Sequence, residues 1–159
     1  MKKRTITTIL IIMLCISIIG LIIFFNKNTK VSQKIMTYYN KQEGKNFEIK
    51  LSDYTNFEWD TVIIYKTPTS KKELFELAGI DYKNELDLQS GMIFVKNNDI
   101  IYEEFFETNF ENPYKFIIYP YEDVNSNNKI NKFSKEEAIF RGEKIKHNNE
   151  SRYILKPVD

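Results

Sequence analysis

Oxygen-bearing side chains recur at regular intervals between Asp123 and Ser134. Counted from Asp123, they occupy positions one, three, five, nine and twelve, and position seven can contribute a backbone carbonyl. Calcium in proteins is bound by roughly six to eight oxygen ligands. The spacing therefore predicts a calcium loop, whose candidate ligands are Asp123, Asn125, Asn127, Lys129, Asn131 and Ser134.

This spacing resembles EF-hand loops, especially those of dockerin modules, over these twelve residues only. It departs from them because Asp123 is the only carboxylate and Ser134 replaces the carboxylate expected at position twelve. With so little ligand charge, the expected Ca²⁺ affinity is at best about millimolar. The alternative is an Asn-rich surface loop that leads to a helix N-cap at Ser134. No cofactor other than this weakly bound calcium is expected.

Aromatic side chains could bind a sugar or a protein partner. Trp59 lies in a strand-like segment with Asp60 on the opposite side. It is either such an anchor or, as is commoner in a small domain, a core residue. Tyr119 and Tyr121 are the other candidate partner-binding residues, in the aromatic and charged stretch Tyr102–Tyr121.

No set of residues meets the requirements of a catalytic site. A Ser-His-acid triad would need His147, the only histidine, which lies in a polar turn. Ser70 and Ser134 are each followed by lysine, but Glu three residues later explains both serines as helix N-caps. The carboxylates that a hydrolase could use are Asp53, Asp60, Asp81, Glu103, Glu104, Glu136 and Glu137. The sole cysteine, Cys15, lies in an apolar segment and is therefore no candidate nucleophile. Because no candidate set is complete, we predict a protein without enzymatic activity.

The composition excludes further classes of protein. The 159 residues include 23 Lys and Arg and 22 Asp and Glu, a net charge of +1 that argues against a nucleic-acid partner. Five glycines leave little for phosphate-binding loops. The charge is uneven, because residues 1–30 hold five basic residues and no acidic one. Residues 31–159 therefore carry 18 basic and 22 acidic side chains, a net charge of −4.

An uncharged, Ile- and Leu-rich run extends from Thr5 to Phe25, directly after three basic residues. A helix needs about 20 apolar residues to cross a bilayer, and this run has 21. It lacks the small residues that precede a signal cleavage site. We therefore predict an uncleaved anchor that contacts the lipid bilayer through residues 5–25. The basic N-terminus predicts a single-pass protein of the cell membrane, with a cytoplasmic N-terminus and its C-terminal domain outside.

The rest of the chain predicts an α+β fold, a mostly antiparallel sheet with two or three short helices. The expected organisation is a cytoplasmic tip and transmembrane anchor over 1–30, a juxtamembrane helix or linker over 31–45, and an extracytoplasmic α+β domain over 46–159. In the juxtamembrane segment, Val31, Ile35 and Tyr38 are expected on one helix face.

Local signals place the elements of the domain. Strands are predicted around residues 47–51, 58–66, 91–96, 100–106 and 114–119, with a last hairpin over 145–155. A capped helix is predicted from Ser70 to Gly79, with Leu74, Leu77 and Ala78 facing inward. The run Asn97-Asn98-Asp99 predicts a hairpin turn, and Ser134 predicts a second short helix over 138–140.

Three segments resemble a known group of proteins: Phe57–Val62, the helix ending at Leu77-Ala78-Gly79, and Met92–Lys96. They are similar to uncharacterised small membrane-anchored or lipid-anchored extracytoplasmic proteins of low-GC Gram-positive bacteria. The resemblance covers Phe47–Tyr121. It implies an extracytoplasmic α+β domain and carries over no functional residue.

The sequence thus predicts a non-catalytic, membrane-anchored binding or accessory protein of the cell envelope. The expected partners are an envelope protein, a peptide toxin or a cell-wall polymer. One alternative is an immunity protein that sequesters a toxin or bacteriocin at the membrane, since a domain charge of −4 suits a cationic peptide. A cell-wall hydrolase is the other alternative.

Overall fold

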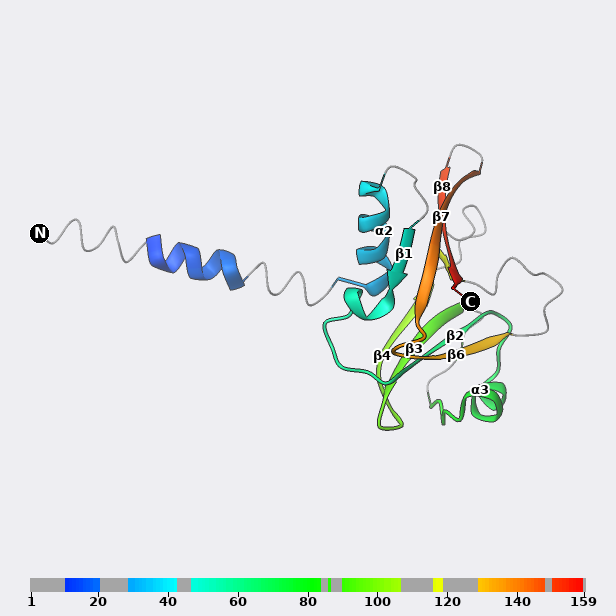
Figure 1. Cartoon of the computed structure of the whole chain (residues 1–159). Helices are drawn as coiled ribbons and strands as arrows, with labels where there is room; N and C mark the ends of the chain where they lie inside the picture. Colours follow the sequence, from blue (N-terminus) through cyan, green and yellow to red (C-terminus); the bar gives the residue numbers. More distant parts are fainter. Residues whose placement is uncertain are drawn as a thin grey trace, which may run out of the picture. The chain divides into compact units, whose positions relative to one another are not determined.

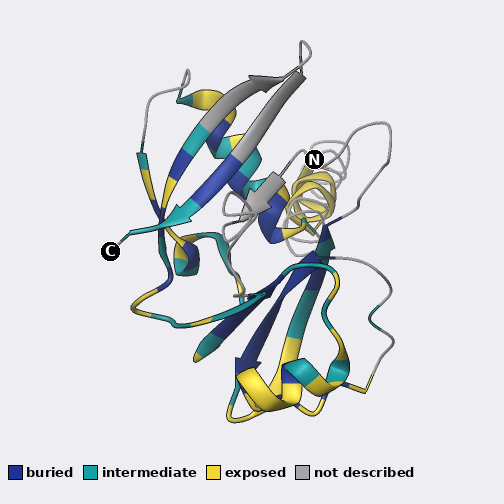
Figure 2. Cartoon of the chain, turned by 90° about the vertical axis from the view of Figure 1, so that its right-hand side faces the viewer, coloured by how far each residue is buried: buried dark blue, intermediate teal, exposed yellow. Residues whose placement is uncertain are grey.

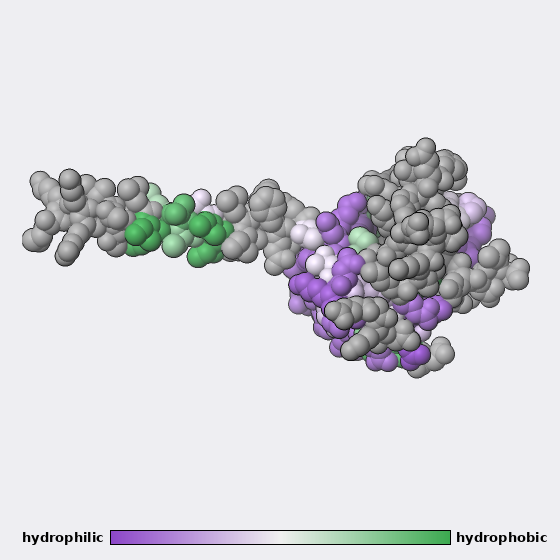
Figure 3. All heavy atoms as spheres, turned by 90° about the horizontal axis from the view of Figure 1, so that it is seen from above, coloured by the Kyte–Doolittle hydropathy of each residue, from purple (hydrophilic) through white to green (hydrophobic). Residues whose placement is uncertain are grey.

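The computed structural model describes residues 11–20, 29–42, 47–83, 86, 90–106, 116–118, 129–147 and 150–158. The chain divides into two units, Met1–Lys30 and Val31–Asp159. In the first unit, residues 11–20 are α-helical with exposed side chains, and Figure 3 shows the hydrophobic residues gathered there. Among the described residues, no helix combines the length and apolar character needed to cross a bilayer. A transmembrane helix over residues 5–25 therefore stays a prediction.

The second unit has an α+β fold, which confirms the predicted class (Figure 1). Its elements are α2 (Val31–Lys41), β1 (Phe47–Lys50), the 3₁₀ turn η1 (Leu51–Tyr54), β2 (Thr61–Tyr65), α3 (Lys71–Ala78), β3 (Ser90–Lys96), β4 (Asp99–Phe106), β5 (Phe116–Ile118), β6 (Ile130–Ser134), β7 (Ile139–His147) and β8 (Glu150–Pro157).

The strands form two sheets. Sheet 1 has the order β1-β7-β8-β5, and sheet 2 has the order β4-β3-β2-β6. All the strand pairs are antiparallel except β5 and β8, which run parallel. The predicted mostly antiparallel architecture is thus confirmed, but it is built as two sheets rather than one.

Sheet 2 separates two clusters of buried side chains. Figure 2 marks most of its central strands, β2 and β3, as buried. Neighbouring side chains on a strand point to opposite faces, so Phe94 and Val95 of β3 enter different clusters. The main core contains Val31, Ile35, Tyr39, Ile49, Leu51, Trp59, Val62, Ile64, Met92, Phe94, Phe106, Ala138, Phe140 and Leu155. The second core contains Ile63, Tyr65, Leu74, Ala78, Ile80, Tyr82, Ile93 and Val95.

Helix α2 lies in the same compact unit as the two sheets, Val31–Asp159. Its residues Val31, Ile35 and Tyr39 recur at four-residue spacing and are almost fully buried in the main core. Tyr39, not Tyr38, thus completes the apolar stripe. Its hydroxyl donates to the carbonyl of Ile154 in β8 at 3.2 Å, which ties the helix to sheet 1.

Helix α3 begins with the predicted capping box. The Ser70 hydroxyl accepts from the Glu73 amide at 3.2 Å, and the Glu73 carboxylate accepts from the Ser70 amide at 2.8 Å. Gly79 ends the helix with a φ of 74°, a conformation that suits glycine. Leu74 and Ala78 are buried as predicted, but Leu77 is 65% exposed, so its predicted inward position is wrong.

The same motif at Ser134 produces a different structure. Ser134 and Glu137 make the same reciprocal hydrogen bonds, and the Ala138 amide donates to the Ser134 carbonyl at 3.0 Å. That single turn is followed at Ile139 by β7, so the predicted second helix is absent from this described segment. The capping box here closes the turn that carries the chain from sheet 2 to sheet 1.

Two predicted hairpins are confirmed. β3 and β4 are joined at Asn97 and Asn98, whose φ angles of 51° and 68° are those of a tight hairpin turn. β7 and β8 form the last hairpin, with His147 paired to Glu150. Both strands of the last hairpin are longer than predicted.

Candidate functional site

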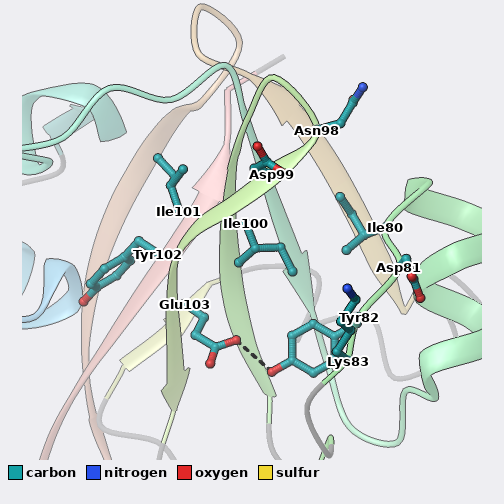
Figure 4. Close-up of a pocket in the computed structure, with 10 residues that line it drawn as sticks. All are labelled: Ile80, Asp81, Tyr82, Lys83, Asn98, Asp99, Ile100, Ile101, Tyr102 and Glu103. Carbon is teal, nitrogen blue, oxygen red and sulfur yellow. Dashed lines mark hydrogen bonds between the residues drawn. The ribbon is translucent and has the colours of Figure 1, made fainter.

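The described domain contains a pocket of about 650 Å³ beside strand β4 (Figure 4). We call it the groove. One wall is the segment Ile80–Lys83, which follows α3, and the other is the first half of strand β4. The lining residues are Ile80, Asp81, Tyr82, Lys83, Asn98, Asp99, Ile100, Ile101, Tyr102 and Glu103. Its volume is within the range of small-ligand pockets, roughly 300–1,000 Å³.

The groove runs along the edge of β4 rather than over one face of the sheet. Side chains alternate in direction along a strand, yet consecutive residues from Asn98 to Glu103 line the groove. Figure 4 shows Ile100 and Glu103 pointing toward the Ile80–Lys83 segment, whereas Ile101 and Tyr102 point to the other side of β4. β4 is also the outer strand of sheet 2, so this edge borders no other strand among the described residues.

A β-bulge lies in the middle of this edge. Phe94 pairs with Tyr102 and Val95 pairs with Ile100, so Ile101 is an extra residue in β4. Such bulges bend a strand and re-aim its side chains. Ile100 and Ile101 are 37% and 41% exposed, which gives the groove apolar surface in contact with solvent.

A hydrogen bond joins the two walls of the groove. The Tyr82 hydroxyl donates to the Glu103 carboxylate at 2.8 Å, and this bond joins the Ile80–Lys83 segment to β4 (Figure 4). Tyr65 lies close enough for both residues to affect its titration. Burial, and then the proximity of Tyr82 and Glu103, raise the pKa of Tyr65 above its ordinary value. Tyr65 is 2% exposed, and its hydroxyl has no hydrogen-bond partner in the described structure.

A buried carboxylate, Glu104, lies on the opposite face of β4 from Glu103. It is 3% exposed and accepts hydrogen bonds from the Val31 amide at 2.9 Å and the Tyr102 hydroxyl at 3.0 Å. The Ser32 hydroxyl donates to its other oxygen. Burial, and then the Glu104 charge, raise the pKa of Tyr102 to about 12. Because the first amides of a helix have no intrahelical acceptor, Glu104 serves as the cap of α2.

Trp59 is a core residue. Its side chain is 1% exposed, its ring meets Phe94 edge-on at 5.2 Å, and its indole nitrogen donates to the Thr55 hydroxyl at 3.0 Å. No ring face is left for a sugar or a partner, which corrects its assignment as a binding residue. The adjacent Asp60 carboxylate accepts from the Asn97 amide at 2.9 Å and so supports the β3–β4 turn.

The structure describes residues 129–134 of the predicted calcium loop. Lys129 directly precedes strand β6, and the others form that strand. The Lys129 carbonyl, the expected ligand at position seven, accepts from the Lys66 amide at 2.9 Å. Asn131 lies in the β2–β6 ladder opposite Ile64, and the Ser134 hydroxyl contacts Glu137. Lys129, Asn131 and Ser134 thus have hydrogen-bonding or strand-pairing partners within the domain, and calcium binding by the loop stays a prediction.

The other predicted site residues lie outside the described residues, namely Asp123, Asn125, Asn127, Tyr119 and Tyr121. Within the described part of the chain, no group of three or more His, Cys, Asp or Glu side chains could hold a metal ion. The Lys129 ammonium pairs with Glu73 at 3.1 Å and thereby ties β6 to the start of α3.

Asp81 and Glu103 are scattered carboxylates in the sequence, and no pattern there places them together. The groove forms where the Ile80–Lys83 segment meets strand β4, about twenty residues later in the chain. A contact between such distant residues leaves no local sequence pattern. One signal was present: two successive isoleucines, Ile100 and Ile101, interrupt the alternation expected of a half-buried strand and mark the bulge.

No protein-family model matches the chain, and no curated protein or solved structure is significantly similar to it. The functional interpretation therefore rests on the chain's own residues.

Proposed function

We propose that this chain is a non-catalytic, membrane-anchored binding protein of the cell envelope, whose extracytoplasmic domain recognises a partner through the groove. The groove along the edge of β4 is the observation that carries the proposal. It combines a volume of about 650 Å³ with solvent-exposed apolar side chains, Ile100 and Ile101. Exposed apolar surface beside polar groups is typical of interaction sites.

The anchor is supported by the composition of the N-terminal unit. Residues 11–20 are helical and include Ile11, Ile12, Met13 and Leu14, each more than half exposed. They lie within the uncharged run Thr5–Phe25, which is long enough to cross a bilayer. An anchor confines the domain to the membrane surface and raises its effective concentration for a partner there.

Single-cysteine labelling tests the location and orientation. Cys15 is the only cysteine, so Cys15→Ser leaves a background in which one introduced thiol reports on its own position. In intact cells, a membrane-impermeant maleimide is expected to label Asp53→Cys, which replaces an exposed residue. Lys2→Cys is expected to react only after permeabilisation. Labelling of Asp53→Cys only after permeabilisation would reverse the proposed orientation.

Crosslinking in intact cells tests the binding function. The full-length protein is expected to capture one partner, and Ile100→Lys should lower that yield about tenfold by placing a charge in the groove. Leu77→Lys is the matched control, because Leu77 is an exposed apolar residue that does not line the groove. Equal yields from Ile100→Lys and Leu77→Lys would overturn the assignment of the groove. Turnover of a cell-wall substrate by the purified protein would overturn the non-catalytic role.

A further inference from the structure

We propose that the groove binds an extended peptide segment rich in basic and apolar residues, which adds a strand to the outer edge of β4. This inference rests on the proposed binding function and names the chemistry of its partner. Three properties of the groove support it: a strand edge, exposed isoleucines and an excess of carboxylates.

The strand edge supplies directional binding groups. Every non-proline residue of a strand has an amide and a carbonyl, and on an outer strand half of these point away from the sheet. β4 is an outer strand, and the groove follows it from Asp99 to Glu103. An extended peptide satisfies these groups by continuing the ladder, which is the recognition mode known as β-augmentation.

The exposed isoleucines favour a peptide that carries apolar side chains. Ile100 points into the groove toward Ile80 (Figure 4), and Ile101 is exposed on the other side of the bulged strand. Side chains of an added strand also alternate in direction. One set of peptide side chains would therefore cover Ile100, and the other set would lie near the carboxylates that line the groove.

The charges of the groove favour basic residues in the second set of peptide side chains. Three carboxylates, Asp81, Asp99 and Glu103, line the groove, against one ammonium, that of Lys83. The whole unit from residue 31 onward has a net charge of −4, which has the same sign as the excess of charge lining the groove. Opposite charge in the partner speeds its approach and selects against acidic segments.

Binding by the full-length protein in nonionic detergent micelles tests these features, with empty micelles as the blank. The probe is a fluorescein-labelled peptide in which lysine and valine alternate over seven residues. A second peptide replaces every lysine with glutamate, and a third carries N-methyl groups on its three central residues. We expect the first peptide to bind at least about tenfold more tightly than either of the others, with an affinity that falls as salt increases.

Variants connect this binding to the groove. The double substitution Asp99→Asn and Glu103→Gln should weaken the lysine peptide about tenfold. Asp53→Asn, at an exposed carboxylate of η1 outside the groove, should not change its affinity. The emission of the buried Trp59 reports that each variant remains folded.

Equal affinity for the lysine and glutamate peptides would overturn the charge preference, and equal affinity for the N-methylated peptide would overturn strand addition. If none of the peptides binds while Ile100→Lys still lowers partner capture in cells, the peptide proposal fails and the binding function stands. If Ile100→Lys has no effect on capture either, both fail.

Discussion

The two faces of sheet 2 are covered to different extents. The main core joins this sheet to α2 and sheet 1, and it contains the large buried rings of Tyr39, Trp59, Phe94 and Phe140. The second core is closed by the eight-residue helix α3 and the segment that follows it, and the groove lies beside that segment. Among the described residues, the larger buried cluster thus lies on one face of sheet 2, and the groove lies beside the smaller cluster on the other.

Polar groups follow the same division. On the main-core face, the buried Glu104 carboxylate accepts from several donors, and the Trp59 indole has an acceptor. On the other face, the buried Tyr65 hydroxyl has no partner among the described residues. Three pairs of substitutions test this contrast between the two faces, and a fourth pair tests the exposed capping boxes.

The largest expected effect is at Phe94. Phe94→Ala should lower the free energy of unfolding by about 3–5 kcal/mol, because the ring packs edge-on against Phe57 and Trp59. Val95→Ala, the next residue on the opposite face, removes two methyl groups and should cost about 2 kcal/mol. Urea unfolding followed by circular dichroism measures both. A larger cost for Val95→Ala would contradict the contrast between the faces.

Glu104→Gln should lower the free energy of unfolding by about 2 kcal/mol, because buried donors lose an acceptor. Glutamine has one acceptor oxygen, whereas the donors around Glu104 are now shared by the two oxygens of its carboxylate. Glu103→Gln is the matched control on the other face, where the side chain is half-buried and accepts from Tyr82. It should cost under about 1 kcal/mol. Equal losses for the two variants would remove the special role of Glu104.

Tyr65→Phe should raise the free energy of unfolding by about 1 kcal/mol, because it removes a buried hydroxyl without a partner. Tyr39→Phe is the opposite case, since the Tyr39 hydroxyl donates to the Ile154 carbonyl. It should lower the free energy of unfolding by about 1 kcal/mol. Thermal unfolding of both variants gives the signs. A destabilised Tyr65→Phe protein would show that this hydroxyl has a partner in solution.

The smallest effect is expected at the exposed cap of α3. The Ser70 amide, then Lys129 and the Ser70 hydroxyl, lower the pKa of Glu73 from 4.5 to about 2. The folded state therefore binds this proton more weakly than the unfolded state. The resulting stabilisation is present above pH 4.5 and is lost as the pH falls toward 2.

Glu73→Gln should accordingly reduce the dependence of stability on pH in this window. Urea midpoints measured between pH 2 and 4.5 check this expectation. Glu137→Gln gives a comparison at the other capping box, where the Ser134 amide lowers the pKa of Glu137 in the same direction. Identical slopes for the wild-type and Glu73→Gln proteins would show that the cap does not form in solution.

Local signals predicted the elements whose structure is decided locally. The helix from Ser70 to Gly79 and the turn at Asn97 and Asn98 each depend on contacts within a few residues. Ser134 carries the same capping motif as Ser70, but the residues after it pair with β1 and β8, and this pairing prevails over helix formation. The motif therefore predicts a hydrogen-bonded turn, and tertiary pairing decides whether a helix or a strand continues from that turn.

The candidate site was harder to predict, because its parts are distant in the sequence. Trp59 was considered for binding because tryptophan is common at interfaces, but the same large ring is also well suited to a core. The groove depends on how the Ile80–Lys83 segment leaves α3 and on the bulge at Ile101. Neither has a periodic pattern in the sequence.

The position of Glu104 has a mechanical consequence. Val31 is the first residue of the domain, and its amide is bonded to a carboxylate of β4. Tension along the chain from residue 30 would enter the domain at this bond, and part of the load would pass directly to the strand that borders the groove. A pull on residue 30 and a ligand in the groove would thus act on the same strand.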